Sequence, residues 1–181
     1  MKGVVFNILE EMVAEHFGMQ VWNDILDTAE TEGVYTAGQS YPDEHLFELV
    51  GITCKKLNMS SEMVIGSFGE YMFHGLHQRY PNFIEKEPTL RSFLKSVESV
   101  IHVEVRKLYQ DPNLPDFEYF DTADGNMIMR YHSPRKLCIL AEGLIRGASS
   151  HYAQKISLSH TTCMHKNDPY CDLEITFHHD C

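Results

Sequence analysis

The sequence contains no long uninterrupted run of apolar residues. None of its apolar stretches reaches the roughly 18 residues that a membrane-spanning helix needs, so no membrane segment is expected. The first twenty residues include Glu10, Glu11 and Glu15, whereas a secretory signal peptide has a basic start and an apolar centre. Together these absences predict a cytoplasmic protein.

Basic residues are also few. Lysine and arginine number 15 against 26 aspartate and glutamate residues, which gives a formal net charge of −11. A protein that binds nucleic acid through the phosphate backbone needs the opposite balance. The charge therefore argues against a nucleic-acid partner and fits a protein that binds a small molecule or another protein.

The cysteines are odd in number. There are five, at positions 54, 138, 163, 171 and 181. In a reducing compartment such a set favours metal ligation or free thiols over disulfides. The chain shows no internal repeat and no low-complexity segment, and its 181 residues suffice for one domain with a core of ordinary size.

The first half of the chain is predicted to be helical. Its apolar residues recur at the spacing of one helix face, and Gly18 and the turn-rich segment 31–44 interrupt them. Ser61 and Thr89 are suitable residues to cap the two later helices, the second of which is expected from about Leu90 to Tyr109. The apolar stripes cover residues 5–17, 21–26, 46–57, 64–76 and 94–108.

The second half has a different pattern. Two alternating runs within residues 117–133 flank Asp124 and Gly125, which is the signal of a β-hairpin. A helix is expected from about Pro134 to Tyr152, followed by strands at 155–163 and 171–179. Strands that arrive as hairpins favour an antiparallel sheet, so the predicted class is α+β. We expect one domain, with a helical subdomain over residues 1–60 packed on an α+β subdomain over 61–181.

A short polar row follows the first hairpin. In an extended strand, alternate side chains share a face, so Tyr131, Ser133 and Arg135 would line up at a repeat of roughly 7 Å if the strand continued that far. An arginine fork binds carboxylate or phosphate, and hydroxyl groups add directional donors. The row would suit a ligand with two carboxylates. A surface strand with solvated polar groups is the simpler alternative for this motif alone.

A histidine lies at the edge of the last apolar stripe. His102 is close to Val105 on the expected helix, and the proline-containing segment "LYQDPNLPDF" follows within ten residues. Proline restricts the backbone, so a rigid loop is expected just past the helix end. A single helical histidine is most often hydrogen-bonded or half-exposed, so a ligand role needs further support.

Three segments together resemble the H-NOX family, the haem nitric oxide/oxygen-binding domains related to the sensor domain of soluble guanylate cyclase. "MKGVVFNILEEMV" with Gly18 and Trp22 resembles the opening of the family. "IHVEVRKLYQDPNLPDF" resembles its haem-ligand helix and the proline that follows, and "YHSPR" resembles its Y-x-S-x-R signature. The resemblance extends over essentially the whole chain.

The resemblance implies a haem-binding protein and a role for each motif residue. In the family, the signature residues bind the two haem propionates, so Tyr131, Ser133 and Arg135 are expected to do so here. His102 matches the proximal iron ligand, and Pro115 matches a proline that presses on the macrocycle. The expected cofactor is haem b, whose two carboxylates and iron suit the polar row and a neutral imidazole.

A further set of residues has the composition of a metal centre. Cys138, His160, Cys163 and Cys171 would provide three thiolates and one imidazole, a closed tetrahedral zinc set of the structural kind. Spacing alone leaves buried or free cysteines open, and His165 is an alternative to His160. A bacterial subgroup of H-NOX proteins carries such a zinc site, which "KLC", "SHTTCMH" and "DPYC" resemble. We therefore expect zinc.

Residues on the distal side of the haem are expected to decide which gas binds. Oxygen-binding members of the family have a tyrosine five residues after the motif arginine, where this chain has Leu140. Val5, Leu9 and Leu144 are further apolar pocket candidates, and His74 stands where a polar pocket residue occurs in oxygen binders. The resemblance implies an NO sensor that also binds CO, with an oxygen-binding haem protein as the alternative.

No enzymatic activity is expected, because no distal acid–base pair accompanies His74. Two non-enzymatic roles stay open beside gas sensing: a redox- or zinc-sensing regulator of the same fold, and a zinc-stabilised adaptor without haem. The chain is short for an output enzyme, and stand-alone bacterial members act with a histidine kinase or a cyclic-di-GMP enzyme. The resemblance implies such a partner, and gas binding is expected to release His102 and to rotate the two subdomains.

Overall fold

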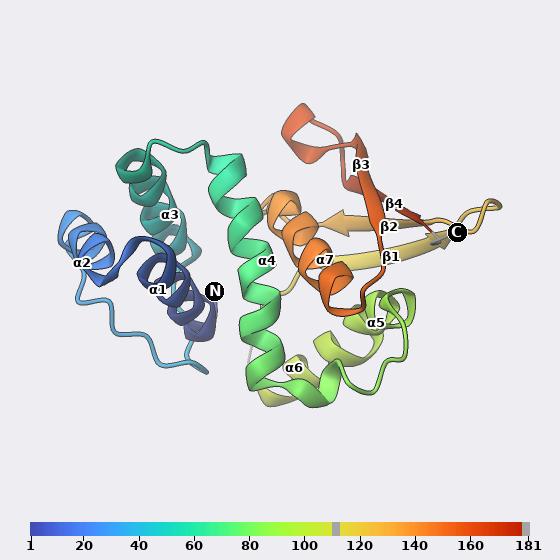
Figure 1. The fold of residues 1–181 in the computed structure, drawn as a ribbon, viewed down its shortest axis with the longest axis horizontal. Helices are drawn as coiled ribbons and strands as arrows, with labels where there is room; N and C mark the ends of the chain where they lie inside the picture. Colours follow the sequence, from blue (N-terminus) through green and yellow to red (C-terminus); the bar gives the residue numbers. More distant parts are fainter. Residues whose placement is uncertain (110–112, 179–181) are drawn as a thin grey trace.

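The structure is a computed structural model that describes residues 1–109 and 113–178. The long helix α4 (Ser61–Arg79) crosses the middle of the molecule. Helices α1 (Gly3–Phe17), α2 (Met19–Thr28) and α3 (Asp43–Leu57) lie on one side of it. Helix α7 (Cys138–His151) and a β-sheet lie on the other (Figure 1). Within the described residues, no helix is both long and apolar enough to span a bilayer.

Three helices form the N-terminal part of the molecule, as the apolar spacing predicted. Gly18 separates the first two, and its φ of 92° lies in the left-handed region that glycine adopts at little cost. The three helices are α1 (Gly3–Phe17), α2 (Met19–Thr28) and α3 (Asp43–Leu57).

Helix α4 is capped by Ser60, one residue before the expected cap, Ser61. The hydroxyl of Ser60 accepts a hydrogen bond from the Met63 amide at 3.2 Å, and Ser61 is the first helical residue. The expectation that Ser61 is the cap is therefore wrong by one position. Both residues are serine, so local sequence does not distinguish them. The short helix η1 (Pro81–Phe83) follows α4.

The expected long helix is divided by a π-helical turn. Thr89 caps it as predicted, because its hydroxyl accepts a hydrogen bond from the Ser92 amide. The wider turn rotates the helix face that follows, so His102 is buried at 8% exposure while Leu108 is 70% exposed. The expected continuation of the apolar stripe to Leu108 is therefore wrong. The segments are α5 (Leu90–Ser96), η2 (Val97–Ile101) and α6 (His102–Leu108).

The C-terminal part contains a four-stranded antiparallel sheet. The two hairpins pair through their inner strands, in the order β1–β2–β4–β3. This arrangement beside packed helices confirms the α+β class. The expected last strand extended to His179, which lies outside the described residues. The strands are β1 (Asp116–Asp121), β2 (Met127–His132), β3 (Ile156–Thr162) and β4 (Cys171–Phe177), with the short helix η3 (Met164–Lys166) between the last two.

Two hydrophobic cores meet at α4 and α7. One fills the space among the N-terminal helices and α4, and the other lies between α5, α7 and the sheet. Helix α4 supplies Phe68 to the first core and Phe73 to the second, and Leu144 of α7 packs against both. The division into residues 1–60 and 61–181 stays a prediction, and the described structure has α4 shared by both cores.

Candidate functional site

His102 is a buried histidine at the start of α6. Its Nδ1 lies 2.7 Å from Oε2 of Glu98, one turn earlier in the chain. Because a carboxylate only accepts hydrogen bonds, the proton of a neutral ring belongs on Nδ1, and the lone pair of Nε2 is left for a metal. Burial lowers the pKa of His102, and the Glu98 carboxylate opposes part of that shift. The site thus supplies the neutral imidazole that haem iron binds.

The polar row extends beyond the strand that was expected to carry it. β2 ends at His132, so Ser133 and Arg135 do not lie on a strand face. Lys136 has a φ of 52°, and this left-handed residue turns the chain before α7. The helix consequently starts later than the expected Pro134.

The three polar side chains nevertheless converge through local contacts. The hydroxyl of Ser133 accepts hydrogen bonds from the amide of Arg135 at 3.4 Å and from its Nε at 3.5 Å. The Tyr131 hydroxyl accepts one from the Leu137 amide at 2.9 Å. Burial raises the pKa of Tyr131, and the Ser133 hydroxyl and the Arg135 charge oppose that shift. Two hydroxyls and a guanidinium are grouped where α7 begins, a donor set suited to carboxylates.

Sequence reasoning missed a carboxylate beside this group. Asp43, at the start of α3, lies 3.9 Å from Nε of Arg135 and 2.6 Å from the N-terminal amine of Met1. Nη1 of Arg135 also contacts Sδ of Met1 at 3.4 Å. The side-chain amide of Asn113 donates a hydrogen bond to the second oxygen of Asp43 at 3.3 Å. No local pattern signals these contacts, because the residues are far apart in sequence.

Aromatic rings connect His102 with the polar group. The ring centroid of Phe117 on β1 lies 5.7 Å from that of His102 and 5.7 Å from that of Tyr131. Pro115 is half-buried and comes two residues before Phe117. A buried imidazole whose Nε2 has no hydrogen-bond partner in the described part of the chain, together with a grouped cation and hydroxyls nearby, matches the iron and the two carboxylates of haem. These residues fit that cofactor.

The four apolar residues expected on the distal side all pack in the N-terminal core. Leu9 of α1 is fully buried, and Leu140 of α7 belongs to the same cluster at 8% exposure. Val5 and Leu144 are half-buried and pack against that cluster. None of these side chains has a hydrogen-bond donor.

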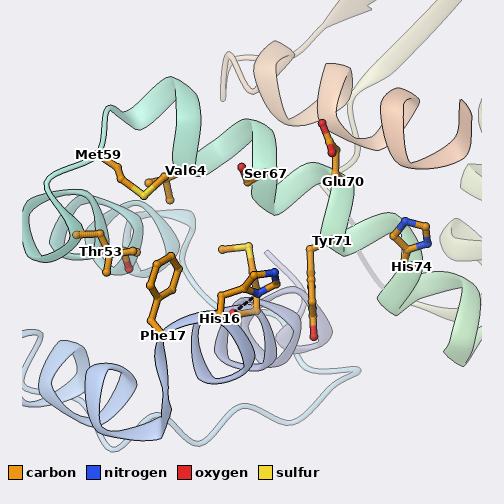
Figure 2. A pocket seen from close by; sticks show the side chains of 11 residues that line it. His16, Phe17, Thr53, Met59, Val64, Ser67, Glu70, Tyr71 and His74 are labelled. Carbon is orange, nitrogen blue, oxygen red and sulfur yellow. Dashed lines mark hydrogen bonds between the residues drawn. The ribbon is translucent and has the colours of Figure 1, made fainter. Parts of the chain in front are cut away.

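His74 is a residue of α4. It is exposed and lines a hollow of about 350 Å³ with His16 and Tyr71, between α1, α3 and α4 (Figure 2). Gly75, the next residue, faces α1, because a β-carbon there would lie 3.1 Å from the side chain of Ile8. A distal role for His74 stays a prediction, and its exposed side chain contrasts with Leu9 and Leu140, which are buried in the N-terminal core.

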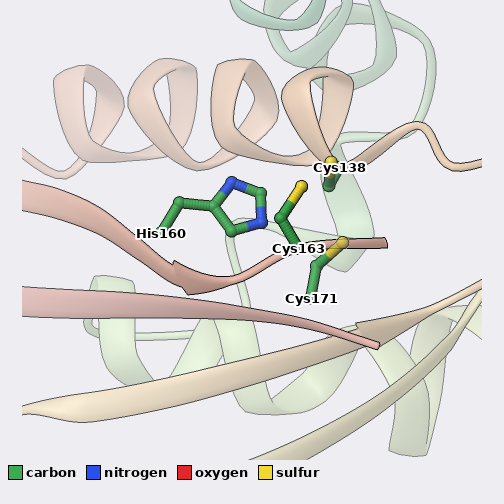
Figure 3. A group of neighbouring side chains, drawn as sticks. All are labelled: Cys138, His160, Cys163 and Cys171. Carbon is green, nitrogen blue, oxygen red and sulfur yellow. The ribbon is translucent and has the colours of Figure 1, made fainter. Parts of the chain in front are cut away.

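A second cluster lies at the start of α7 (Figure 3). One ligand atom from each of Cys138, His160, Cys163 and Cys171 lies within 4.8 Å of the other three. Cys138 is the first residue of α7, and the other three residues belong to β3, the turn after it and β4. A register shift in β3 between His160 and Thr162 bends the strand beside the cluster.

The surroundings of His160 fit a metal ligand. Its Nδ1 lies 2.9 Å from Oε1 of Glu142, while its Nε2 is buried and has no hydrogen-bond partner among the described residues. Burial and the neighbouring thiols raise the pKa of Cys138. A bound cation would lower this pKa instead, because it stabilises the thiolate. His165 is exposed and contacts the Lys136 carbonyl at 2.8 Å instead. Three sulfurs and one imidazole are a donor set that fits zinc.

Comparison with known proteins shows the family of the chain. The model of the haem-NO-binding family matches residues 2–160. The chain belongs to the H-NOX family. Members of this family are haem-based gas sensors rather than enzymes, and solved H-NOX structures include complexes with NO, CO and oxygen.

Several solved H-NOX structures are similar to this chain. The Shewanella oneidensis H-NOX protein in its Fe(II)NO state is 39% identical with a TM-score of 0.94, covering 99% of this chain and 100% of that one. The NMR structure of the S. oneidensis domain in its Fe(II)CO state is 40% identical with a TM-score of 0.92, with 99% and 100% covered. The Shewanella woodyi H-NOX bound to IWP-051 is 28% identical with a TM-score of 0.85, with 97% and 94% covered.

Proposed function

We propose that this H-NOX protein is a sensor of NO that uses haem b. His102 would hold the haem iron through Nε2, and Tyr131, Ser133 and Arg135 would bind the two propionates. Pro115 would contact the macrocycle. When bound, the haem supplies an iron centre that takes up diatomic gases. The support is the buried imidazole, which contacts Glu98 through Nδ1 and leaves Nε2 without a partner among residues 1–109 and 113–178, and the donor group at the start of α7.

The apolar side chains expected on the distal side favour NO and CO over oxygen. Oxygen as a ligand is stabilised by a charge-assisted hydrogen bond from the protein, worth roughly 1.5–3 kcal/mol. At ~1.4 kcal/mol per decade, that is about one to two decades of affinity. Val5, Leu9, Leu140 and Leu144 offer no donor, and His74 is exposed at a hollow between α1, α3 and α4. NO and CO gain far less from such a bond. These apolar side chains are the observation that carries the proposal.

An absorption spectrum of the reduced protein tests the gas selectivity. NO and CO should each give a stable complex, and air-saturated buffer should not. Leu140→Tyr adds a hydroxyl near the ligand and should raise oxygen affinity, whereas Leu140→Phe adds the ring without the donor and should not. A stable oxygen complex in the unmutated protein would overturn the NO proposal in favour of an oxygen-binding haem protein.

The proposal includes one structural zinc ion. Cys138, His160, Cys163 and Cys171 provide four ligands and leave no open position for a substrate. The orphaned Nε2 of His160 supports this assignment, because a buried polar atom without a partner is costly unless something binds it. Zinc would tie α7 to the second hairpin.

The output of the sensor goes to a separate protein, a histidine kinase or a cyclic-di-GMP enzyme. His102 is the first residue of α6, so a change at its imidazole can move that helix. A partner responds only if it binds the two states with different affinity. The test compares binding of a purified candidate kinase to the ferrous protein with and without NO. Equal affinity with unchanged kinase activity would exclude that candidate.

A further inference from the structure

Glu98 and Arg106 form a hydrogen-bonded series with His102, which begins at Nδ1 of the imidazole ring and not at Nε2. Oε2 of Glu98 lies 2.7 Å from Nδ1 of His102, and Oε1 of the same carboxylate lies 2.7 Å from Nη2 of Arg106. We propose that Glu98 sets how strongly His102 donates electrons to the haem iron, and that Arg106 limits that effect. This inference rests on the proposed function, because it requires His102 to bind iron.

The π-helical turn is the local feature that brings these residues together. Glu98 lies within η2, and the amide of His102 donates a hydrogen bond to the Val97 carbonyl, five residues back. Such turns are rare and occur often at functional sites. Arg106 follows one turn later on α6, so all three side chains occupy neighbouring positions along one helical surface.

The hydrogen bond between Glu98 and His102 is largely shielded from solvent. The side chain of His102 is 10% exposed and that of Glu98 is 24% exposed, while Arg106 at 42% lies nearest to solvent. Phe117 packs against the imidazole with ring centroids 5.7 Å apart. A hydrogen bond between a charged and a neutral group is stronger in such surroundings than in water.

The physical effect follows from the charge on the acceptor. A carboxylate that accepts the Nδ1 proton raises the basicity of the other ring nitrogen, as carboxylate–histidine–metal groups do in other metal sites. A stronger donor stabilises the more positive oxidation state and strengthens the bond to the metal. Arg106 withdraws charge from the same carboxylate, so it should weaken the effect of Glu98 on His102. Removing Glu98 and removing Arg106 should therefore have opposite consequences.

The experiment compares three variants of the haem-loaded protein. Glu98→Gln keeps an acceptor and loses the charge, Arg106→Gln frees the carboxylate, and Glu104→Gln is the matched control. Glu104 is on the same helix, 41% exposed, and pairs with Lys107. The readouts are the reduction potential and the vibrational frequency of the iron–histidine bond in the ferrous protein.

The expected shifts have opposite signs. Glu98→Gln should raise the potential and lower the frequency, Arg106→Gln should lower the potential and raise the frequency, and Glu104→Gln should change neither. Shifts of the same sign for the first two variants would indicate a packing role and overturn the inference, as would values equal to those of the unmutated protein. If Glu98→Gln does not fold, the sign of the Arg106→Gln shift still decides.

A second readout does not depend on the iron. Nitrogen NMR of the haem-free chain should find the His102 proton on Nδ1 and a change in its shift in Glu98→Gln. A proton on Nε2 instead would overturn the assignment. If the unmutated protein takes up no haem, the proposed function fails as well. If it takes up haem and all variants have one potential, only this inference fails.

Discussion

Arg135 is a nearly buried cation with incomplete neutralisation. Its side chain is 10% exposed, and the carboxylate near it, Asp43, is 3.9 Å away and also holds the N-terminal amine at 2.6 Å. A buried charge is costly unless it is well paired. The arrangement is therefore suited to an additional anion, and a haem propionate is the anion that we propose.

Replacing Arg135 with alanine should weaken haem binding. The variant loses a charge-assisted bond worth about 1.5–3 kcal/mol, which corresponds to roughly one to two decades of affinity. The measurement is the rate of haem transfer to an excess of a haem-scavenging protein. Arg79→Ala is a suitable control, because Arg79 pairs with Glu11 on the N-terminal helices. Equal transfer rates in both variants would exclude the clamp.

Individual residues were predictable where the signal is local. Tyr131, Ser133 and Arg135 form a contiguous motif, and the four-residue spacing of Glu98 and His102 could have indicated their contact. The position of His74 could not be read from the sequence. It depends on which face of α4 turns toward each of two cores, and that is fixed only by packing.

At the scale of elements, the contact between α4 and α7 depends on glycine. A β-carbon on Gly143 would lie 2.3 Å from the carbonyl oxygen of Gly66 and 2.8 Å from Cα of Gly69. Both neighbours are backbone atoms, which cannot move without shifting a helix. Gly143 therefore allows the close approach of α4 and α7, the two helices at which the cores meet.

Gly143→Ala should destabilise the protein. Overpacking at a rigid contact costs typically about 1–3 kcal/mol, so the melting temperature should fall by several degrees. Gly51→Ala on α3 is the control, because a β-carbon there meets nothing within 4 Å. Helix propensity favours alanine by roughly 0.5–1 kcal/mol at such a position, so this variant should be slightly more stable. Equal melting temperatures in the two variants would contradict the close-contact account.

Removal of zinc should destabilise the region where α7 meets the second hairpin. Cys171→Ser should lower the zinc content below about one ion per chain and should lower the melting temperature. Cys54→Ser, at a half-buried free cysteine of α3, should change neither. Elemental analysis and thermal unfolding provide the two measurements. A fully folded, zinc-free unmutated protein would refute the metal site.

The types and order of the main helices and strands were predictable, whereas several boundaries were not. Hydrophobic spacing indicates a helix from about Leu90 but carries no mark of the π-helical turn, because Val97 and Ile101 continue the helical spacing of apolar residues through η2. Helix α7 begins later than expected because Lys136 adopts a positive φ and the Tyr131 hydroxyl accepts a hydrogen bond from the Leu137 amide. Lysine gives no local signal for that conformation.

At the scale of the whole molecule, Asp43 ties segments that are distant in sequence. Its carboxylate holds the N-terminal amine before α1, approaches Arg135 before α7 and accepts a hydrogen bond from Asn113 before β1. The contact thus joins the N-terminal helices to the C-terminal part beside the proposed propionate site. A rigid-body rotation of one part against the other would have to change these contacts.

Asp43→Asn should loosen the junction between the two parts. The neutral amide keeps the shape but loses the charge that two cationic groups face, a loss of about 1–3 kcal/mol for partly buried charged hydrogen bonds. In the haem-loaded protein, hydrogen–deuterium exchange should increase at Gly3 and Val4, whose amides bond to Gln39 and Ala37, and at the start of α7. Helix α2 should exchange as before.

The matched control for this prediction is Asp27→Asn. It removes the same charge from an exposed carboxylate of α2 that has no side-chain partner within residues 1–109 and 113–178. Exchange at the junction should then equal that of the unmutated protein. If both variants accelerate exchange equally, the effect belongs to net charge and the bridging role of Asp43 is excluded. If neither does, the junction is held by the apolar contacts of Leu144 with the two cores.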